Sequence, residues 1–467
     1  MSIDLSLHSS TRPLSSLVVR GGAPVHGTVT VSGFKHVQVL AIAYAIGVGR
    51  RTVLTNVPDI LETRTYLDLL PRLGIDITQA GSSLLLAPGA ANNPTAGTAG
   101  PGAVLPNEAA SIHGSLYLLP ALLALRGRVG FSSFGGCPIG STTDEGSRPW
   151  RHIVRVVERF GARFDERRRE LTLPHGGFRA TELDLGTFAD DQRTLTGPEY
   201  SGATKAAVLT AAFAEGTTVL HRPYQKAELR ALLDLLKQDG VGVTWSGGSL
   251  EITPHARPGD LLTYDLPPDL LEVVTWTTVA AVTGGAIQLA NVTPELIKEG
   301  LSAEHALWHA AGVRFTRHPG GGITVRGPLD GAFASLPEIR VDPTTIYSDS
   351  QPLFTVLATQ CPGPTRLVDG VWTGRYRHLD GLAALGADTR RTPDGAVIGD
   401  TPLRAAAEGT WLRATDLRCA AALVVAALAS PGGPVQIGGT QHLERGYDHL
   451  PQKLAACLAN APLQPTL

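Results

Sequence analysis

The sequence lacks a surplus of charge of either sign. Its 40 Lys and Arg residues nearly balance its 42 Asp and Glu residues, which leaves a formal net charge of -2 at pH 7 and a pI near 6.7. Proteins that bind nucleic acids or membrane surfaces through charge carry a concentrated positive excess. Neither partner is therefore expected, and a small molecule is the favoured ligand.

Long hydrophobic runs and clustered cysteines are also missing. The longest uninterrupted apolar run, from Ala420 to Ala429, is far shorter than a membrane span, and the first sixteen residues contain no apolar signal-peptide core. The four cysteines are widely spaced, without a CxxC or Cys/His grouping, so neither a disulfide framework nor a zinc site is indicated. We expect a cytoplasmic protein, and no metal or other cofactor.

What the sequence does have is length and a recurring pattern. Its 467 residues, 43% of them hydrophobic, are too many for one core. An apolar, Ala-rich helix, a glycine turn and a short strand recur, followed by a polar loop and an amphipathic helix. The turn and strand occur six times, at 49–57, 127–134, 216–223, 284–292, 363–371 and 432–440. This predicts an α/β protein of two similar halves with a cleft between them; a solenoid is the alternative, but its repeats are usually shorter.

One glycine-rich stretch, FGGCPIGSTTDEGSRPW at 134–150, combines groups that can bind an anion. Its glycines allow backbone amides to converge on a phosphate or carboxylate, and Arg148 can add charge-assisted hydrogen bonds. Cys137 would lie in the resulting positive field, which favours a reactive thiol. The alternative is an inert structural cysteine on a loop.

Apolar helices begin with SGFKHV, YSGATK and TDLRCA, which place small, polar and basic residues at their N-termini. Helix N-termini attract anions, so Lys35 and His36 are candidate ligand contacts, although Lys35 could equally be a solvated first-turn lysine. Arg375, in TGRYRHLDGL, and Arg445, in HLERGYDHL, precede amphipathic helices in the same slot as Cys137. Reuse of one slot predicts convergence on one ligand, although isolated surface arginines are common.

Asp349, in IYSDSQPLF, heads another apolar helix. A carboxylate at that position is by default an N-cap. Facing arginines across a cleft, it could also act as a general base. The residue pattern alone leaves both roles open.

With these residues in view, the chain resembles the enolpyruvyltransferases from about Leu17 to its end. The shared motifs are VSGFKH, NVPDI, GGCPIG, ERFGARF, SGATKAAVLTAAFAEGTT, TDLRCAAALVVAAL and ERGYDHL. The resemblance implies a two-domain inside-out α/β barrel with three βαβαββ-type repeats per domain. One domain would span 35–262 and the other 1–34 plus 263–467. It also implies transfer of enolpyruvyl from phosphoenolpyruvate to a hydroxyl, with release of phosphate.

The resemblance also implies roles for individual residues. Cys137 would supply a proton, carry a covalent adduct or act mainly in product release. Asp349 would take the proton of the acceptor hydroxyl, and Lys35 would act with them. Backbone amides at Ser201 and Gly202 would bind the phosphate of a nucleotide. Contacts to phosphoenolpyruvate would come from Lys35, Arg148, Arg375 and Arg445.

The chain departs from the UDP-N-acetylglucosamine 1-carboxyvinyltransferase pattern on the acceptor side. His36 replaces an asparagine, Ala109 an arginine and His113 a tryptophan, and Trp150-Arg151 replaces an apolar-acidic pair. The catalytic loop is also longer, by about four residues. These departures favour the branch that gives enolpyruvyl to the 3′-hydroxyl of UMP in nikkomycin and polyoxin biosynthesis. The expected acceptor contacts are His36, His113, Trp150, Arg151, Ser201, Gly202 and Asp349.

Two alternatives remain at this point. The first is the peptidoglycan enzyme that acts on UDP-N-acetylglucosamine, and the second is a non-catalytic nucleotide-binding relative. The shikimate-pathway enzymes share the implied fold but lack the loop that carries Cys137. The expected partners are phosphoenolpyruvate and a uridine nucleotide, and the sequence leaves the oligomeric state open.

Overall fold

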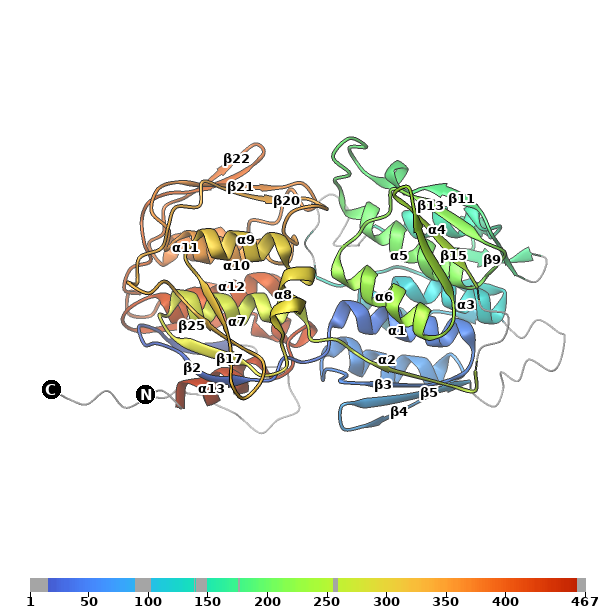
Figure 1. The fold of residues 1–467 in the computed structure, drawn as a ribbon, viewed down its shortest axis with the longest axis horizontal. Helices are drawn as coiled ribbons and strands as arrows, with labels where there is room; N and C mark the ends of the chain where they lie inside the picture. The colour runs from blue at the N-terminus through green and yellow to red at the C-terminus, as the bar shows by residue number, and fades with distance from the viewer. Residues whose placement is uncertain are drawn as a thin grey trace. The chain divides into compact units, whose positions relative to one another are not determined.

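A computed structural model describes residues 16–88, 102–137, 139, 149–174, 177–254 and 259–459. The chain forms two compact units (Figure 1). Unit 1 contains residues up to Ser32 and from Pro268 onward, and unit 2 runs from Gly33 to Pro267. The domain boundaries expected from the sequence were 35 and 262. The last strand of unit 2 extends to Asp265 and pairs with a strand near the start of that unit.

Three apolar helices pack together in the interior of unit 2. They are nearly apolar all round, so burial on every side is the arrangement that removes most apolar surface from water. The three are α1 (Lys35–Val48), α3 (Leu118–Arg126) and α5 (Pro198–Ala212). Amphipathic helices bury one face each: α2 (Leu61–Arg72), α4 (Arg151–Arg159) and α6 (Ala227–Gln238). Short 3-10 turns lie at η2 (Asn107–Ser111), η3 (Gly114–Tyr117) and η5 (Leu185–Phe188).

The four-stranded sheets of unit 2 share one pairing pattern. In each, a parallel pair is extended by an antiparallel hairpin, in the orders β16-β3-β5-β4, β6-β7-β9-β8 and β11-β13-β15-β14. The strands are β3 (Arg51–Thr55), β4 (Ile75–Ala80), β5 (Ser83–Pro88), β6 (Ala103–Val104), β7 (Arg128–Gly130), β8 (Arg163–Asp165), β9 (Glu170–Thr172), β11 (Glu182–Asp184), β13 (Thr218–His221), β14 (Gly242–Ser246), β15 (Ser249–Thr253) and β16 (Leu261–Asp265). A small parallel pair joins β10 (Phe178–Arg179) to β12 (Ala214–Glu215).

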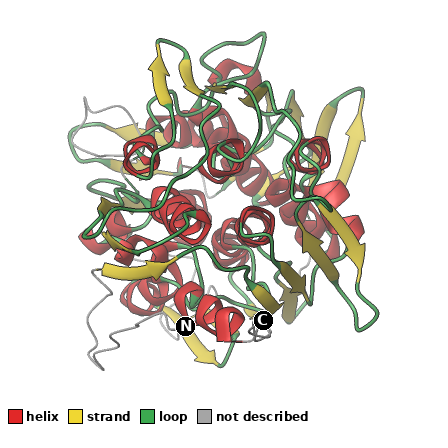
Figure 2. Cartoon of the chain, turned by 90° about the vertical axis from the view of Figure 1, so that its left-hand side faces the viewer, coloured by secondary structure: helices red, strands yellow, loops and turns green. Residues whose placement is uncertain are grey.

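Unit 1 is built on the same plan. Its mutually packed, buried helices are α7 (Leu270–Val282), α10 (Gln351–Ala358) and α12 (Leu417–Ala429). Asp269 caps α7 and Asp416 caps α12, each accepting hydrogen bonds from two backbone N–H groups of the first turn. Figure 2, which faces this unit, shows helices seen end-on with strands toward the outside. The remaining helices are α8 (Pro294–Gly300), α9 (Ser302–Ala310), α11 (His378–Ala384), α13 (Leu450–Ala459) and the 3-10 turn η6 (Thr440–Arg445).

The sheets of unit 1 repeat the parallel pair and antiparallel extension. Their orders are β2-β17-β19-β18, β20-β21-β23-β22 and the shorter β24-β25-β1. The strands are β1 (Ser16–Arg20), β2 (His26–Val29), β17 (Ala286–Leu289), β18 (Arg314–Arg317), β19 (Ile323–Arg326), β20 (Glu338–Val341), β21 (Thr365–Asp369), β22 (Thr389–Thr392), β23 (Gly395–Ile398), β24 (Trp411–Arg413) and β25 (Pro434–Gly438).

Each of the six glycine-marked segments of the sequence forms a strand, namely β3, β7, β13, β17, β21 and β25. Every one of these strands lies between its parallel and its antiparallel neighbour. A central strand pairs along both edges, and most of these strands alternate buried and more exposed side chains, so one face of each packs against the interior. Strand β5 reaches Pro88 and β6 pairs with β7; residues 89–101 lie outside the described part.

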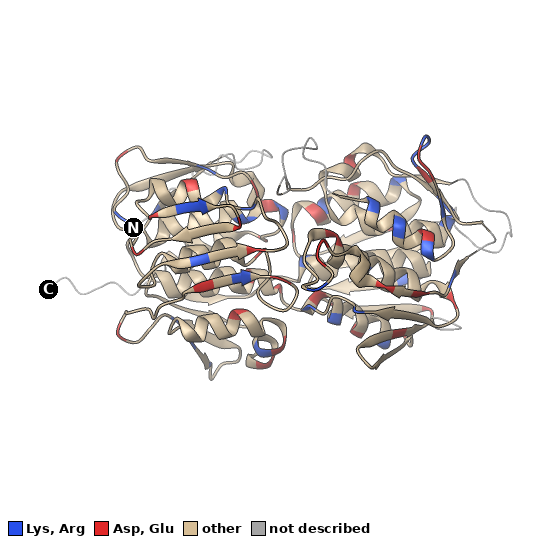
Figure 3. Cartoon of the chain, turned by 90° about the horizontal axis from the view of Figure 1, so that it is seen from above, with Lys and Arg blue, Asp and Glu red and all other residues tan. Residues whose placement is uncertain are grey.

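Charged residues of both signs are intermingled over the outer elements of each unit (Figure 3). Among the described helices, none combines the length and the hydropathy that a membrane span requires.

Candidate active site

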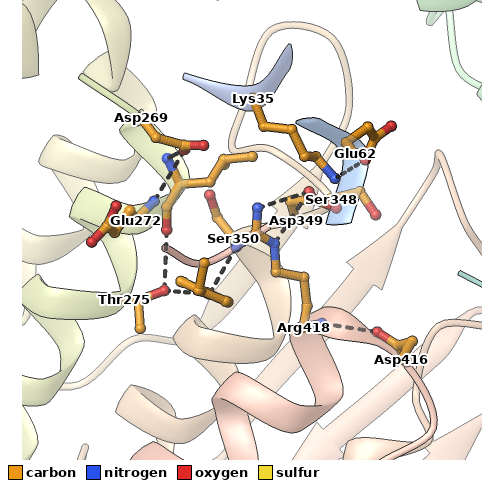
Figure 4. Close-up of polar contacts among 12 residues, drawn as sticks. Lys35, Glu62, Asp269, Glu272, Thr275, Ser348, Asp349, Ser350, Asp416 and Arg418 are labelled. Atoms are coloured by element: carbon orange, nitrogen blue, oxygen red, sulfur yellow. Dashed lines mark hydrogen bonds and ion pairs between the residues drawn. The ribbon is translucent and has the colours of Figure 1, made fainter. Parts of the chain in front are cut away.

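Asp349 is the centre of a polar cluster in unit 1. Its Oδ1 lies 2.6 Å from Nη1 of Arg375. Its Oδ2 accepts a hydrogen bond from Nε of Arg418 at 3.2 Å; Figure 4 shows Asp349 and Arg418. Asp349 precedes α10, Arg375 follows β21, and Arg418 belongs to the first turn of α12. Three elements that are distant in the sequence therefore bring one carboxylate and two guanidinium groups together.

The two arginines are buried, with side-chain exposures of 5% for Arg375 and 1% for Arg418. Burial disfavours the charged form of Arg375, but Asp349, Asp416 and Asp369 outweigh it, so its pKa is raised above the ordinary value. The pKa of Arg418 is raised in the same way, because Tyr447 and Asp349 outweigh its burial. Both side chains are fixed cations inside the protein.

A chain of hydrogen bonds leads from Arg418 to helix α7. Nη1 of Arg418 donates to the Tyr447 hydroxyl at 2.7 Å, and that hydroxyl lies 2.6 Å from Oγ1 of Thr275. The Thr275 hydroxyl also donates to the backbone carbonyl of Leu271. Since all of these side chains are buried, the chain holds the guanidinium of Arg418 in one orientation.

Arg445 ends the 3-10 turn η6 and is half-buried. Burial lowers the pKa of the neighbouring His442, and the positive charge of Arg445 lowers it further. The charge of Arg445 thus disfavours protonation of His442, and the expected contact of Arg445 with phosphoenolpyruvate stays a prediction.

In unit 2, Lys35 is the first residue of α1, and its side chain is 15% exposed. Its Nζ lies 3.6 Å from Oε2 of Glu62 in α2 (Figure 4). Oε1 of Glu62 accepts a hydrogen bond from the backbone N–H of Gly114 at 3.0 Å. Glu62 therefore contacts both Lys35, at the start of α1, and Gly114, at the start of η3.

His36 follows Lys35 and packs edge-on against the ring of Phe34. It interacts electrostatically with Glu228, a buried carboxylate in the first turn of α6. Burial raises the pKa of Glu228, but Lys205, whose Nζ lies 2.8 Å away, and His36 outweigh burial and lower that pKa to about 2. His36 therefore lies beside a fixed negative charge.

The glycines before Cys137 pack closely against the segment that contains Ala110 and His113. A Cβ added at Gly135 would collide with the backbone carbonyl oxygen of Ala110, and one at Gly136, where φ is +113°, would come within 3.0 Å of the His113 Cβ. Both glycines are needed for this close approach. Cys137 itself is half-buried. Arg148, expected on the same loop, lies outside the described residues.

Trp150 and Arg151 have partners within unit 2. The Trp150 ring is 9% exposed and packs against Phe131 and Phe164, with centroids 5.2 Å and 5.8 Å away. Both terminal nitrogens of Arg151 bond to the Glu166 carboxylate, at 3.0 Å and 2.8 Å. Their expected role at the acceptor stays a prediction.

Ser201 and Gly202 lie inside α5, which begins at Pro198, three residues before Ser201. The start is earlier than the YSGATK motif indicated, because Gly197 turns with φ at +105° and Pro198 suits the first helical position. A Cβ at Gly202 would collide with Nε2 of His152 in α4. Gly202 therefore allows two helices to approach, and its role with a phosphate stays a prediction.

Sequence reasoning missed several residues of these clusters. Arg418 and Tyr447 stand in the motifs TDLRCA and ERGYDHL, but nothing in the sequence marks them as buried partners of Asp349 and Thr275. The available signal was an arginine inside an otherwise apolar helix. Glu62 and Glu228 appear as ordinary first-turn acids of amphipathic helices, so their contacts emerge only from the fold.

Unit 1 places two buried arginines on the carboxylate of Asp349, and unit 2 has a lysine at a helix start and a half-buried cysteine. Cationic groups of this kind are suited to anionic ligands. The sequence profile of the EPSP synthase (3-phosphoshikimate 1-carboxyvinyltransferase) family matches residues 19–454. The chain belongs to this family and is an enolpyruvyl (carboxyvinyl) transferase.

Similar proteins cover almost the whole chain. UDP-N-acetylglucosamine 1-carboxyvinyltransferases from Methylorubrum extorquens and Caulobacter vibrioides are 29% and 30% identical, over 94% and 95% of this chain and 97% and 96% of theirs. The enolpyruvyl transferase NikO from Streptomyces tendae has a TM-score of 0.80 at 29% identity, covering 94% of this chain and 97% of its own. EPSP synthase from Acinetobacter baumannii shares the fold, with a TM-score of 0.66 at 18% identity, over 92% and 95% of the two chains.

Proposed function

We propose that this protein transfers the enolpyruvyl group of phosphoenolpyruvate to the 3′-hydroxyl of UMP, with release of phosphate, in peptidyl nucleoside antibiotic biosynthesis. In each unit, the three larger sheets would form the faces of an inside-out barrel. The observation that carries the chemistry is Asp349, held by two buried arginines whose charge is fixed. A carboxylate in that position can accept a proton while the cations beside it bind an anion.

The anionic groups of phosphoenolpyruvate require several cations. Lys35 in unit 2 and Arg375 and Arg445 in unit 1 are the proposed contacts among the described residues, and Arg148 is a further proposed contact. Cations fixed in advance stabilise charge that develops during reaction without reorganising. The same groups would hold the released phosphate.

The reaction proposed for these residues is an addition followed by an elimination. The acceptor oxygen attacks the carbon that bears the phosphate, Asp349 takes the hydroxyl proton, and a proton from Cys137 adds to the methylene carbon. Loss of a proton from that carbon then expels phosphate and restores the double bond in the enol ether. Cys137 as the carrier of a covalent adduct is the alternative role.

The acceptor is proposed from the residues that depart from the UDP-sugar pattern. His36, Ala109 and His113 lie in unit 2, on or next to the elements that hold Lys35 and the Cys137 loop. A nucleoside monophosphate ends in a phosphate where a UDP-sugar continues, and an imidazole such as that of His36 can donate to it. Ser201, Gly202, Trp150 and Arg151 are proposed as further acceptor contacts. The likeness to the enolpyruvyl transferase NikO supports this branch.

The second candidate acceptor is UDP-N-acetylglucosamine. It is favoured by the names of the curated relatives, which are as similar to this chain as NikO is. The test is phosphate release from phosphoenolpyruvate with each acceptor in turn. Turnover with UMP alone supports the proposal. Turnover with the UDP-sugar alone would mean that the substitutions on the acceptor side do not change the acceptor. Release with neither acceptor would contradict both.

A further inference from the structure

The residues on both sides of Asp349 are bound by one carboxylate, that of Glu304. Oε1 of Glu304 accepts a hydrogen bond from the backbone N–H of Tyr347 at 2.7 Å and another from the hydroxyl of Ser350 at 2.9 Å. Glu304 belongs to the first turn of α9, and it is 1% exposed. A single buried oxygen therefore accepts hydrogen bonds from both ends of the short segment 347–350.

The bond from Ser350 to Glu304 is unusual for the position of this serine. Ser350 is the N-cap of α10, where a serine hydroxyl ordinarily accepts a hydrogen bond from an N–H of the first turn. No such side-chain cap bond forms, and the hydroxyl donates to Glu304 instead. The hydroxyl thus links the start of α10 to another helix.

Packing next to this carboxylate holds the two helices together independently. Trp308, one turn further along α9, is fully buried and stacks on Phe354 of α10, with ring centroids 5.4 Å apart. This apolar contact does not involve the side chain of Glu304, so we expect it to persist when Glu304 is replaced. The hydrogen bonds of Glu304 therefore act on the segment at the head of α10 rather than on the docking of the helix.

The segment has a second anchor on its other side. The Ser348 hydroxyl donates to Oδ2 of Asp369 at 2.6 Å, and Asp369 also accepts hydrogen bonds from the backbone N–H groups of Val371 and Trp372. With its neighbours bound in this way, Asp349 directs its carboxylate to the two arginines.

We propose that Glu304 is a positioning residue, which holds segment 347–350 so that Asp349 keeps the place from which it takes the acceptor proton. This inference rests on the proposed function, in which Asp349 is the general base. A base must lie within hydrogen-bond reach of the proton it removes. A displacement of about 1 Å can reduce the rate by ~100-fold.

The test compares two substitutions of one side chain. Glu304→Leu removes both hydrogen bonds, and we expect kcat to fall by roughly 10 to 100-fold with the KM for phosphoenolpyruvate within about twofold of its original value. Glu304→Gln keeps an oxygen that can accept both bonds, and its kcat stays within about threefold. Ile297→Ala, which removes buried packing from α8 without removing a hydrogen bond, is the control for lost stability and keeps its kcat.

Ser350→Ala tests the same contact from the other side and covers the case in which Glu304→Leu does not fold. It removes one of the two bonds, so we expect a kcat about 3 to 10-fold lower. In the double variant with Glu304→Leu, the serine substitution adds no further loss, because both changes break one interaction. Fully additive losses would contradict the inference.

Asp349→Asn separates this inference from the proposed function. If Asp349→Asn loses turnover while Glu304→Leu and Ser350→Ala keep the original kcat, Asp349 acts but Glu304 does not position it. If Asp349→Asn retains turnover, the role proposed for Asp349 fails, and the inference fails with it. The inference is supported when Asp349→Asn and Glu304→Leu lose kcat while Glu304→Gln keeps it.

Discussion

Nη1 of Arg418 lies 2.7 Å from the hydroxyl of Tyr447, and both side chains are buried. Tyr447→Phe deletes that hydroxyl and leaves a buried charged donor without this acceptor. We expect the free energy of unfolding to fall by about 1 to 3 kcal/mol. Chemical denaturation measures the change. Thr275→Val removes a neutral partner of the same hydroxyl, together with a hydrogen bond to the Leu271 carbonyl, but leaves no charged group unpaired; it is the comparison variant and has the smaller effect. Equal stability of Tyr447→Phe and the unmodified protein would contradict this network.

The four cysteines should differ sharply in reactivity. Burial raises the pKa of Cys361 to about 12 and that of Cys419 and Cys457 to about 11, whereas Cys137 is half-buried on its loop. Only a thiolate reacts rapidly. Brief treatment with iodoacetamide at pH 8 should therefore modify one site per chain, located by peptide mass spectrometry at Cys137. Cys137→Ser should abolish it, and equally rapid modification of Cys419 would refute the assignment.

Two buried histidines predict how stability depends on pH. Burial lowers the pKa of His152 to about 3, and Arg155 acts in the same direction. Burial also lowers the pKa of His378 to about 3, although the nearby Asp416 acts in the opposite direction. In the unfolded chain each takes up a proton near pH 6.5, so the unfolded state binds more protons between about pH 6.5 and 3. Stability should therefore decrease as the pH falls, by about 2 kcal/mol per histidine at pH 5.

The measurement is denaturation at pH 7 and pH 5, where most carboxylates still carry their charge. His152→Gln and His378→Gln should each flatten the dependence, while the exposed control His449→Gln keeps the original slope. A stability that does not change between these two pH values would show that both histidines are protonated in the folded protein.

Gly135 should not tolerate even a methyl group. Its Cβ would collide with the backbone carbonyl oxygen of Ala110, which cannot yield as a flexible side chain would. Gly135→Ala should lower the free energy of unfolding by about 1 to 3 kcal/mol and reduce turnover by displacing Cys137. Gly177→Ala, whose Cβ would meet nothing within 4 Å, is the control. Unchanged activity in Gly135→Ala would mean that the loop adapts.

Periodicity in the sequence predicted much of the architecture because it reflects local physics. Helices that are apolar on every side have to be buried, and glycine-marked apolar segments form the central strands. Asp349 and Arg375 were both proposed for the site from their positions before helices, and the fold places them 2.6 Å apart. In such cases the local signal and the tertiary contact coincide.

Other parts of the clusters depend on contacts that no local pattern encodes. Arg418 meets Asp349 across 69 residues of sequence, and Thr275 meets Tyr447 across 172. In the sequence, Glu304 resembles any acidic residue in the first turn of a helix. Its contacts with Tyr347 and Ser350 exist only in the folded protein. The burial of a charge is determined by its tertiary partners, so these residues could be found only in the folded protein.

The most direct test of the central claim is a competition between the two acceptors in one reaction. Phosphoenolpyruvate, UMP and UDP-N-acetylglucosamine are supplied together at equal concentrations, and the products are identified by mass spectrometry, with the position of the new ether bond determined by NMR. We predict enolpyruvyl-UMP substituted at the 3′-oxygen as the main product. Enolpyruvyl-UDP-N-acetylglucosamine as the main product would contradict the proposed acceptor.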